Sequence, residues 1–337
     1  MAGRPPGTGK PTLKTIAGLS GLAVPTVSRA LSDAPDIGAA TKKRVREIAR
    51  QVGYQPNRAG QGLRTGRSNV VSLILAARCD MMNHTAVLIT AMAAELRRSG
   101  YDLIVTPHSP DQDPMEPVRQ VVRTGMADAI VLNQILPDDP RVRFLAERGF
   151  PFATHGRSEC GIAHPWYDYD NAAFGRTAIA ELASRGCRRV AMIAPPRGQT
   201  YAEHMISAAG AEAARRGIAF EVAPDIDIAS PREAIAGSVA RRLASGPRLD
   251  GYVCASNTAT MSAVAAAEAA GRVLGRDIQV FAKETADILK LFRREIIVVG
   301  EDLVRTGEFL SRAVVQAIRD PDAAPLQALA PPGPVAP

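Results

Sequence analysis

The sequence predicts an all-α head with a helix-turn-helix layout, followed by an α/β body built from two doubly wound lobes. Three observations lead to this fold class. Short amphipathic patterns fill residues 12–56, the excess of positive charge is confined to the first 68 residues, and apolar β runs alternate with helical segments from Val70 onward. We therefore expect a small basic domain attached to a much larger body with parallel sheets.

The head is predicted to hold three helices. Thr12 is a suitable N-cap for the first, whose apolar residues at helical spacing are Leu13, Ile16, Ala17 and Leu19. Gly21 and Leu22 make the turn. The second helix spans Val24–Leu31, where Pro25 is tolerated because the first helical turn has no internal N–H bonds to lose. The third helix begins near Thr41.

The same spacing assigns the faces of the second and third helices. Residues expected in the core are Val27, Ala30, Leu31, Val45, Ile48, Ala49 and Val52. Residues left outward on the second helix are Val24, Pro25, Ser28 and Arg29. The basic residues of the third helix are expected to stay solvated and to supply general electrostatic attraction: Lys42, Lys43, Arg44, Arg46 and Arg50.

The charge distribution points to nucleic acid. Residues 1–68 contain 12 of the 41 Lys and Arg residues and 3 of the 34 Asp and Glu residues, so they carry +9 while the rest carries −2. A basic module on a nearly neutral body is typical of a phosphate-binding head. In a helix-turn-helix the second helix enters the major groove. Arg29 is therefore a candidate for a bidentate contact with guanine, and Thr26, Ser28 and Ser32 are candidates for phosphate oxygens.

The body is predicted to contain two sets of strands separated by helices. The first set comprises 70–75, 101–106, 128–133 and 151–156, and the second comprises 189–194, 250–256, 277–282 and 295–300. Strands that alternate with helices imply parallel sheets with crossover helices. Because ligands of such folds bind beyond the carboxyl ends of the strands, the expected ligand site is the cleft between the two lobes.

The head segments GLAVPTVSRAL, TKKRVREIARQVGYQPN and GLRTGRSN resemble the lactose/galactose repressor (LacI/GalR) family. The match is specific across residues 12–68 and looser to about residue 320. The resemblance implies a homodimeric transcriptional regulator, with repression favoured over activation, that reads a pseudo-palindromic operator in double-stranded DNA. It places Val24, Pro25 and Arg29 at base-reading positions. The remaining DNA-binding candidates are Thr12, Leu13, Thr41, Tyr54, Asn57 and Leu63.

The resemblance also implies a hinge helix that starts at Asn57 and whose Leu63 wedges into the minor groove and kinks the site. Gly60 and Gly62 stand where better helix formers are usual, and each costs about 1 kcal/mol against Ala. We therefore expect a hinge that is disordered until DNA and the dimer partner hold it. The usual Ser N-caps of helices two and three are replaced by Ala23 and Gly38, at about 1 kcal/mol and a few tenths respectively.

For the body, the resemblance implies a periplasmic-binding-protein-like fold with a sugar-sized effector between the lobes. The chain would cross between the lobes three times, and we place the crossings near Tyr167, Glu295 and Ala317. Candidate effector-binding residues stand at strand ends, at helix starts or at family positions: Asn83, His84, Asn133, Arg157, Asp170, His204, Asn257 and Glu284.

Several of these candidates depart from the family pattern. Asp170 and Asn171 match its Asp-Asn motif, but His204 replaces an effector-gripping arginine and Ser256-Asn257 replaces an Asn-Asp pair. Glu284 falls at the position of an Asp that binds sugar hydroxyls. The set suggests a small polar effector, a sugar or sugar-like molecule. Each residue also has a structural alternative; Asn257, for example, suits the N-cap of the helix that follows it.

Other features exclude several classes of function. Cys79, Cys160, Cys187 and Cys254 are scattered without metal spacing, so we expect reduced packing cysteines, no metal site and no cofactor. The GTGK sequence near the start lacks the first Gly and the final Ser or Thr of a P-loop, and residues 1–11 are expected to be a flexible basic tail. No run approaches the ~18 apolar residues of a membrane span and no signal peptide precedes the head, so we expect a cytoplasmic protein.

The expected domains are a helix-turn-helix domain over 12–56, a hinge over 57–68, the two-lobed body over 69–320 and a Pro/Ala-rich tail over 321–337 that is disordered or lies on the surface. Without a leucine heptad in that tail, a dimer is favoured over a tetramer. The sequence contains no GxSxG, HExxH or dinucleotide-binding glycine turn, which argues against an enzyme. The alternatives are a regulator with a non-sugar effector or none, and a cytoplasmic solute-binding protein.

Overall fold

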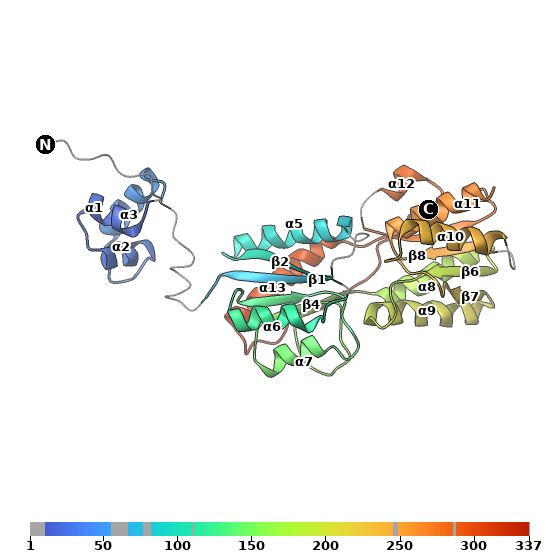
Figure 1. Cartoon of the computed structure of the whole chain (residues 1–337), viewed down its shortest axis with the longest axis horizontal. Helices are drawn as coiled ribbons and strands as arrows, with labels where there is room; N and C mark the ends of the chain where they lie inside the picture. Colours follow the sequence, from blue (N-terminus) through green and yellow to red (C-terminus); the bar gives the residue numbers. More distant parts are fainter. Residues whose placement is uncertain are drawn as a thin grey trace. The chain divides into compact units, whose positions relative to one another are not determined.

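The computed structural model describes residues 11–54, 67–76, 82–109, 111–244, 249–285 and 288–336, without the side chains of residues 76 and 82–84. Two compact units, Met1–Ser68 and Asn69–Pro337, make up the chain (Figure 1). Nearly all of the expected N-terminal tail, residues 1–11, and of the expected hinge, residues 57–68, lies outside the described residues. This includes the DNA-binding candidates Asn57 and Leu63. The side chains of the effector candidates Asn83 and His84 also lie outside the described part.

The head consists of α1 (Leu13–Ser20), α2 (Val24–Leu31) and α3 (Ala39–Gln51), as the helical spacing predicts. Thr12 caps α1, since its hydroxyl accepts from the Thr15 amide and its own amide donates to the Thr15 hydroxyl. Gly21 ends α1 in the left-handed region, with φ 69°. No side chain caps α2 at Ala23 or α3 at Gly38.

The head core is formed by Ile16, Val27, Ala30, Val45 and Ala49, with partly buried apolar residues packed around them. Two expectations about its surface are wrong. Leu19 is 59% exposed, because the position one turn after Ile16 is taken by Ser20, which is buried. Lys42 is largely covered, with a side-chain exposure of 17%, because its ammonium group binds Asp33.

The first lobe contains a parallel sheet with the strand order β11-β5-β4-β3-β1-β2. Its strands are β1 (Val70–Ala76), β2 (Asp102–His108), β3 (Ala129–Leu132), β4 (Phe152–His155), β5 (Trp166–Tyr169) and β11 (Gln327–Ala330). α5 (Met82–Arg98) and α13 (Leu303–Arg319) cover one face, while α6 (Met115–Thr124) and α7 (Pro140–Glu147) cover the other (Figure 1). Alternate β1 residues serve the two cores, Leu73 facing α5 and α13 and Ile74 facing α6 and α7.

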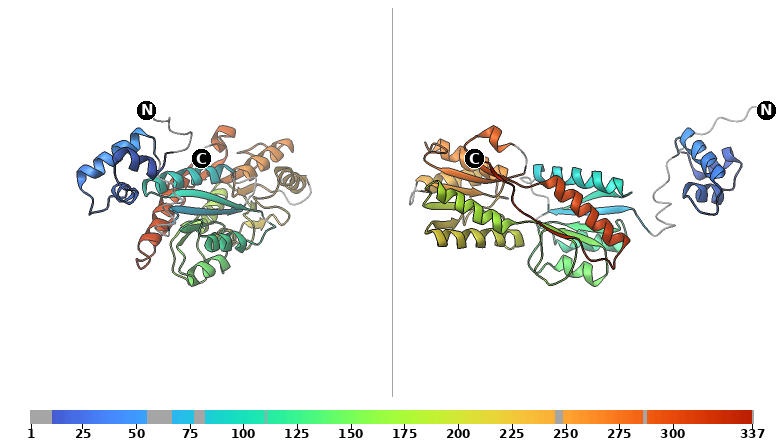
Figure 2. Two further views of the ribbon diagram at one scale, coloured as in Figure 1. Left: turned by 60° about the vertical axis from the view of Figure 1, so that its left-hand side comes forward. Right: turned by 180° about the vertical axis from the view of Figure 1, so that it is seen from behind.

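The second lobe repeats this plan of a sheet between helices (Figure 2). Its strand order is β12-β10-β9-β8-β6-β7. Its strands are β6 (Arg189–Ile193), β7 (Ala219–Val222), β8 (Gly251–Cys254), β9 (Gln279–Glu284), β10 (Ile297–Gly300) and β12 (Val335–Ala336). Its helices are α8 (Asn171–Ser184), α9 (Thr200–Arg216), α10 (Arg232–Ala244), α11 (Asn257–Ala269) and the short α12 (Leu289–Phe292). β12 is antiparallel to β10, and the other strands are parallel.

The chain crosses between the lobes three times, and two of the three crossings are not where the sequence suggested. The first crossing lies between β5 and α8, about one turn after Tyr167. The second follows β10, at Glu301 and Asp302, and not near Glu295, because β10 still belongs to the second sheet. The third lies between β11 and β12, since Ala317 is inside α13, whose apolar face continues to Ile318.

The Pro/Ala-rich segment 321–337 contributes a strand to each sheet, which corrects the expectation that it is a disordered or surface-lying tail. β11 pairs in parallel with β5, from Gln327–Trp166 to Ala330–Tyr169. β12 pairs with β10 at Val299 and Val298. Such edge strands need only backbone hydrogen bonds on one side, so a short, weakly patterned sequence suffices.

Candidate functional site

The outward face of α2 presents Pro25 and Arg29 as exposed side chains, beside the half-buried Val24, Thr26 and Ser28. Pro25 lies in the first turn, where it removes a donor that has no helical acceptor. The side chains expected to meet DNA from this helix are therefore accessible at its surface.

Arg29 is held by an acidic partner from the loop between α2 and α3. Its Nη2 lies 2.5 Å from Oδ2 of Asp36, and about half of each side chain is exposed. An arginine has five N–H donors, so this ion pair leaves donors for a second ligand. Ser32 closes α2, because its hydroxyl donates to the carbonyl of Arg29 over 3.2 Å.

A second acidic residue of the loop, Asp33, holds two cations of α3. Its Oδ1 lies 3.0 Å from Lys42 Nζ and 2.9 Å from Arg46 Nη2. The hydrogen bond and charge of Lys42, with Arg46, hold the pKa of Asp33 below its usual range. Part of the positive charge of α3 is thus neutralised within the head.

The other described candidates of the head have identifiable structural positions. Thr12 caps α1. Leu13 and Tyr54 pack against the head core, and burial raises the pKa of Tyr54. Thr41 lies half-buried in the first turn of α3. None of these positions by itself indicates a contact with DNA.

The body contains a pocket of about 110 Å³ whose wall is shared by the two lobes. The first lobe contributes Asn133, Gln134, His155, Gly156, Asp168 and Tyr169. The second contributes Asn171, Tyr201, Ile228, Ala255, Ser256, Asn257, Thr258, Lys283 and Thr285, and Glu301 comes from the second crossing. Most of these residues follow the carboxyl end of a strand, where ligands of such sheets bind.

Buried ion pairs line or adjoin this pocket. Lys283 Nζ lies 2.6 Å from Glu301 Oε2, 3.4 Å from Asn171 Oδ1 and 4.1 Å from the centre of the Tyr169 ring. Asp168 accepts from Arg157 Nε over 2.8 Å. Burial raises the pKa of Asp168, and the charge and hydrogen bond of Arg157 oppose that rise. The charges of Lys283 and Asp168, which line the pocket, are therefore each paired with a group of opposite charge.

Tyr169 offers a hydroxyl to the pocket wall. This side chain is buried, and its hydroxyl has no hydrogen-bond partner among the residues that the structure describes. Burial raises the pKa of Tyr169, so the group stays protonated and can donate. A buried donor of this kind is suited to a polar ligand.

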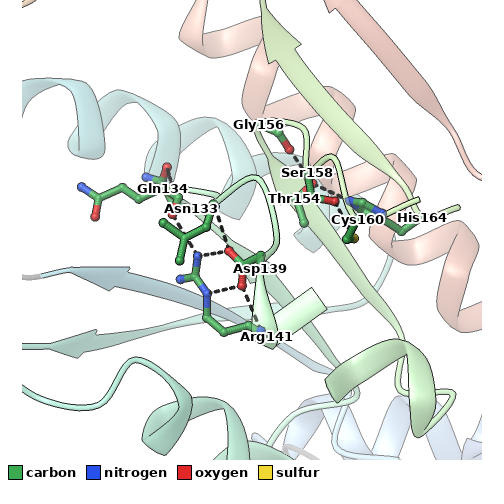
Figure 3. A network of polar contacts seen from close by, with 10 residues as sticks. Asn133, Gln134, Asp139, Arg141, Thr154, Gly156, Ser158, Cys160 and His164 are labelled. Atoms are coloured by element: carbon green, nitrogen blue, oxygen red, sulfur yellow. Dashed lines mark hydrogen bonds and ion pairs between the residues drawn. The ribbon is translucent and has the colours of Figure 1, made fainter. Parts of the chain in front are cut away.

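A network of polar contacts holds the loop that carries the pocket residues Asn133 and Gln134 (Figure 3). Arg141 donates to Asp139 through Nε over 2.9 Å and Nη2 over 2.6 Å, and to the Gln134 carbonyl over 2.9 Å. Burial would raise the pKa of Asp139, but the hydrogen bonds and charge of Arg141 outweigh it and lower the pKa. Asn133 in turn accepts from the Gln134 amide over 2.6 Å. The loop is thus anchored by a buried ion pair.

The predicted effector residues divide into two groups. Asn133 and Asn257 line the pocket, and Ser256 rather than Asn257 caps α11, accepting from Ala259 N over 3.2 Å. Arg157 donates to Asp168, which lines the pocket, but does not line the pocket itself. Asp170 caps α8 through Ala173 N over 2.7 Å, also outside the lining.

His204 and Glu284 are engaged elsewhere. His204 on α9 contacts Arg157 Nη2 over 3.4 Å and Glu159 Oε1 over 3.2 Å, which joins the second lobe to the first. Glu284 is buried and accepts from the amides of Ile288 and Leu289, so it caps the start of α12. Both contacts are with protein groups, and neither residue is part of the lining.

Sequence reasoning missed the ionic residues of the pocket, namely His155, Asp168, Lys283 and Glu301. A signal was present for Lys283, which follows the apolar residues of a buried strand. Lysine is almost never fully buried unless it is paired. For Asp168 the strand itself was not predicted, so its position at the carboxyl end of β5 was not foreseen.

Within the described residues, no helix is long and apolar enough to span a membrane. The same residues contain no group of three or more His, Cys, Asp or Glu side chains placed to hold a metal ion.

Two protein-family models match the chain. The model for bacterial regulatory proteins of the lacI family matches residues 12–57, and the model for a periplasmic binding protein-like domain matches residues 179–336. The transcriptional regulator AglR of Rhizobium meliloti (strain 1021) is 31% identical over 286 residues, which cover 84% of this chain and 80% of AglR. The regulator CelR of Thermobifida fusca is 25% identical over 324 residues, or 92% of each chain.

Solved structures share the fold. The lac repressor dimer bound to operator and the anti-inducer ONPF matches 97% of this chain and 99% of its own, with a TM-score of 0.83 and 17% identity. A complex of the transcriptional regulator CelR with cellobiose matches the same shares with a TM-score of 0.70 and 21% identity. These similarities confirm the predicted fold class, a helix-turn-helix head with a two-lobed α/β body.

Proposed function

Because this chain belongs to the lacI family of bacterial regulatory proteins, which bind DNA and control transcription, we propose that it is a homodimeric repressor with a pseudo-palindromic operator. A small effector between the lobes of the body sets its affinity for that operator. The observation that carries the proposal is a pocket walled by both lobes, in a chain whose basic head presents an arginine on its second helix.

The head is proposed to read DNA through Arg29, with Val24 and Pro25 beside it. Arg29 is exposed and lies on α2, the helix that enters the major groove in this motif. Its guanidinium suits the O6 and N7 atoms of guanine. The cations of α3 supply attraction that does not depend on sequence. The proposed hinge over 57–68, with Asn57 and Leu63, continues the interface.

The test is operator selection from random and genomic fragments with the full-length protein, followed by sequencing of the bound pool. A palindromic motif supports a dimeric, sequence-specific regulator, whereas an enriched pool without a motif contradicts it. Arg29→Ala should remove the preference for the motif, and Lys43→Ala should weaken binding to all duplexes about equally. Equal losses from both substitutions would show that Arg29 reads no base.

The effector is proposed to be an uncharged polyhydroxyl molecule, a sugar or sugar-like compound. Lys283 is paired with Glu301 and Asp168 with Arg157, so a phosphate or carboxylate would have to compete for a cation that already has a carboxylate partner. Amide, hydroxyl and paired carboxylate groups instead suit hydroxyls, which both donate and accept. The complex of CelR with cellobiose is consistent with this class of ligand.

Thermal shift tests the effector proposal. Neutral mono- and disaccharides should raise the melting temperature of the body, since a ligand at 100 times its Kd adds about 2.7 kcal/mol to the native state. Matching sugar phosphates should not, and Asn257→Ala should weaken the response. Stabilisation by the phosphates alone would overturn the neutral class. A regulator with a different effector or none is the alternative, favoured if no such compound stabilises the protein.

A further inference from the structure

The loop between α2 and α3 contains two aspartates that form ion pairs with different cations of the head. Asp36 pairs with Arg29, the residue proposed to read a base, at 2.5 Å. Asp33 pairs with Lys42 and Arg46 of α3, which are proposed to attract phosphates in general. Two carboxylates of one loop are therefore paired with cations that are proposed to have different functions, base reading and attraction of phosphates.

The position of Asp36 is fixed by the loop around it. The Ala34 amide donates to the Arg29 carbonyl over 3.0 Å, and the Ile37 amide donates to the Ala34 carbonyl over 3.2 Å. Ile37 packs against the head core, and Pro35 restricts the backbone before Asp36. The carboxylate thus reaches Arg29 from an anchored segment.

We propose that Asp36 is a positioning residue that determines sequence specificity by holding the Arg29 guanidinium for one base pair. A free arginine on an exposed helix has many rotamers, and it can bind phosphates as readily as guanine. An acceptor on one side of the planar guanidinium restricts its orientation and leaves the other donors for guanine. The carboxylate also makes a nearby phosphate an unfavourable alternative partner. This proposal rests on the proposed function, in which Arg29 reads DNA.

The experiment measures binding of the full-length protein to the selected operator and to a scrambled duplex at one salt concentration. Asp36→Asn should lower the ratio of specific to nonspecific affinity by roughly three- to tenfold, part of the discrimination of a bidentate pair. The loss should concentrate at one base pair of the operator. Asp36→Glu, which keeps the carboxylate, should restore part of the ratio.

Asp33→Asn is the matched control, because it removes the same charge from the same loop. Asp33 has φ 60°, a left-handed conformation that Asn tolerates well, so the exchange introduces no backbone strain. It should raise operator and nonspecific affinity by similar factors and leave their ratio unchanged. A ratio that falls equally in both variants would overturn the assignment to Asp36.

The Arg29→Ala background separates the two proposals. If Arg29→Ala abolishes specificity and Asp36→Asn then has no further effect on the ratio, Asp36 acts through Arg29. If Asp36→Asn changes both affinities by one common factor in the native background, it merely repels phosphates, and the positioning role is refuted while base reading stands. If Arg29→Ala keeps full specificity, the proposed reading by Arg29 fails first.

Discussion

Replacing Gly307 by Ala should destabilise the body, because α13 and α5 touch at this glycine. A Cβ added to Gly307 would lie 2.7 Å from the Ala91 Cβ, 3.0 Å from the Met92 nitrogen and 3.1 Å from the Leu88 oxygen. Two of these atoms are backbone, so no side-chain rotation relieves the overlap. To reach ordinary contact at about 3.4 Å, the helices must separate by about 0.7 Å, a gap that forfeits a quarter to a half of each pairwise attraction across it.

The magnitude follows from two opposed terms. Overpacking of this kind costs about 1–3 kcal/mol, and the gain in helix propensity from Gly to Ala is about 1 kcal/mol. Because the overlap is with backbone, we expect the upper part of that range and a net loss of about 1–2 kcal/mol. Affinity for the proposed effector should fall as well, since α13 starts two residues after Glu301, which lines the pocket.

The assay is calorimetric melting of the full-length variant beside Gly210→Ala. Gly210 lies in α9, and a Cβ there would meet nothing closer than Phe220 at 3.9 Å, so the control should be stabilised by up to about 1 kcal/mol. The two variants should shift the transition of the body in opposite directions. A Gly307→Ala protein as stable as the parent would refute the close packing of α5 and α13.

Three further predictions concern the cap, the buried ion pair and the thiols. Ala23→Ser should stabilise the head by about 1 kcal/mol, because residue 23 is extended and no side chain caps α2; an unchanged head transition in thermal melting would count against it. Lys283→Met should destabilise the body by about 3–5 kcal/mol in chemical denaturation, because it removes the ammonium group 2.6 Å from the buried Glu301 and leaves His155, at 3.6 Å, as its basic neighbour. Adding Glu301→Gln should recover much of the loss, and no recovery would show that packing, not charge, dominates. Burial raises the pKa of Cys187 and Cys254 to about 12, so alkylation at pH 9 should spare both thiols in the native protein and modify them after unfolding. Since the pKa values of both thiols are raised, the contribution of the thiols to stability is complete below the unfolded pKa of about 8.5 and is lost as the pH rises toward 12. Rapid labelling of the native protein would contradict the burial of the two thiols.

Local patterns predicted the head almost completely. The second helix was placed at Val24–Leu31, and Val27 and Ala30 are buried as the spacing required. The buried face of such a helix is set by apolar residues three and four positions apart, and this spacing is present in the sequence itself. Leu19 departs from the pattern, because Ser20 at i+4 from Ile16 takes the buried position and Leu19 at i+3 is exposed.

Local patterns failed for short strands at or near sheet edges. β5, β7, β11 and β12 were not predicted, and without β11 and β12 the third crossing between the lobes was misplaced. Four residues of Trp166–Tyr169 or Gln327–Ala330 contain too little periodicity to identify a strand. β11 and β5 pair with each other although they lie more than a hundred residues apart in the sequence, so a local pattern cannot reveal either strand.

The sequence by itself determined the fold class, the division into a basic head and a two-lobed body, and the face of α2 that is exposed. These properties follow from charge, spacing and turn residues that act over a few positions. Only the tertiary structure decided which polar residues share the pocket. Asp168, Lys283 and Glu301 come from different strands and a crossing. Glu284, the neighbour of Lys283, caps a helix instead, and so does Asp170, which follows β5. Lys283 and Glu284 are successive residues of β9, and successive residues of a strand point to opposite sides, so a shift of one position separates a pocket-facing group from a structural one.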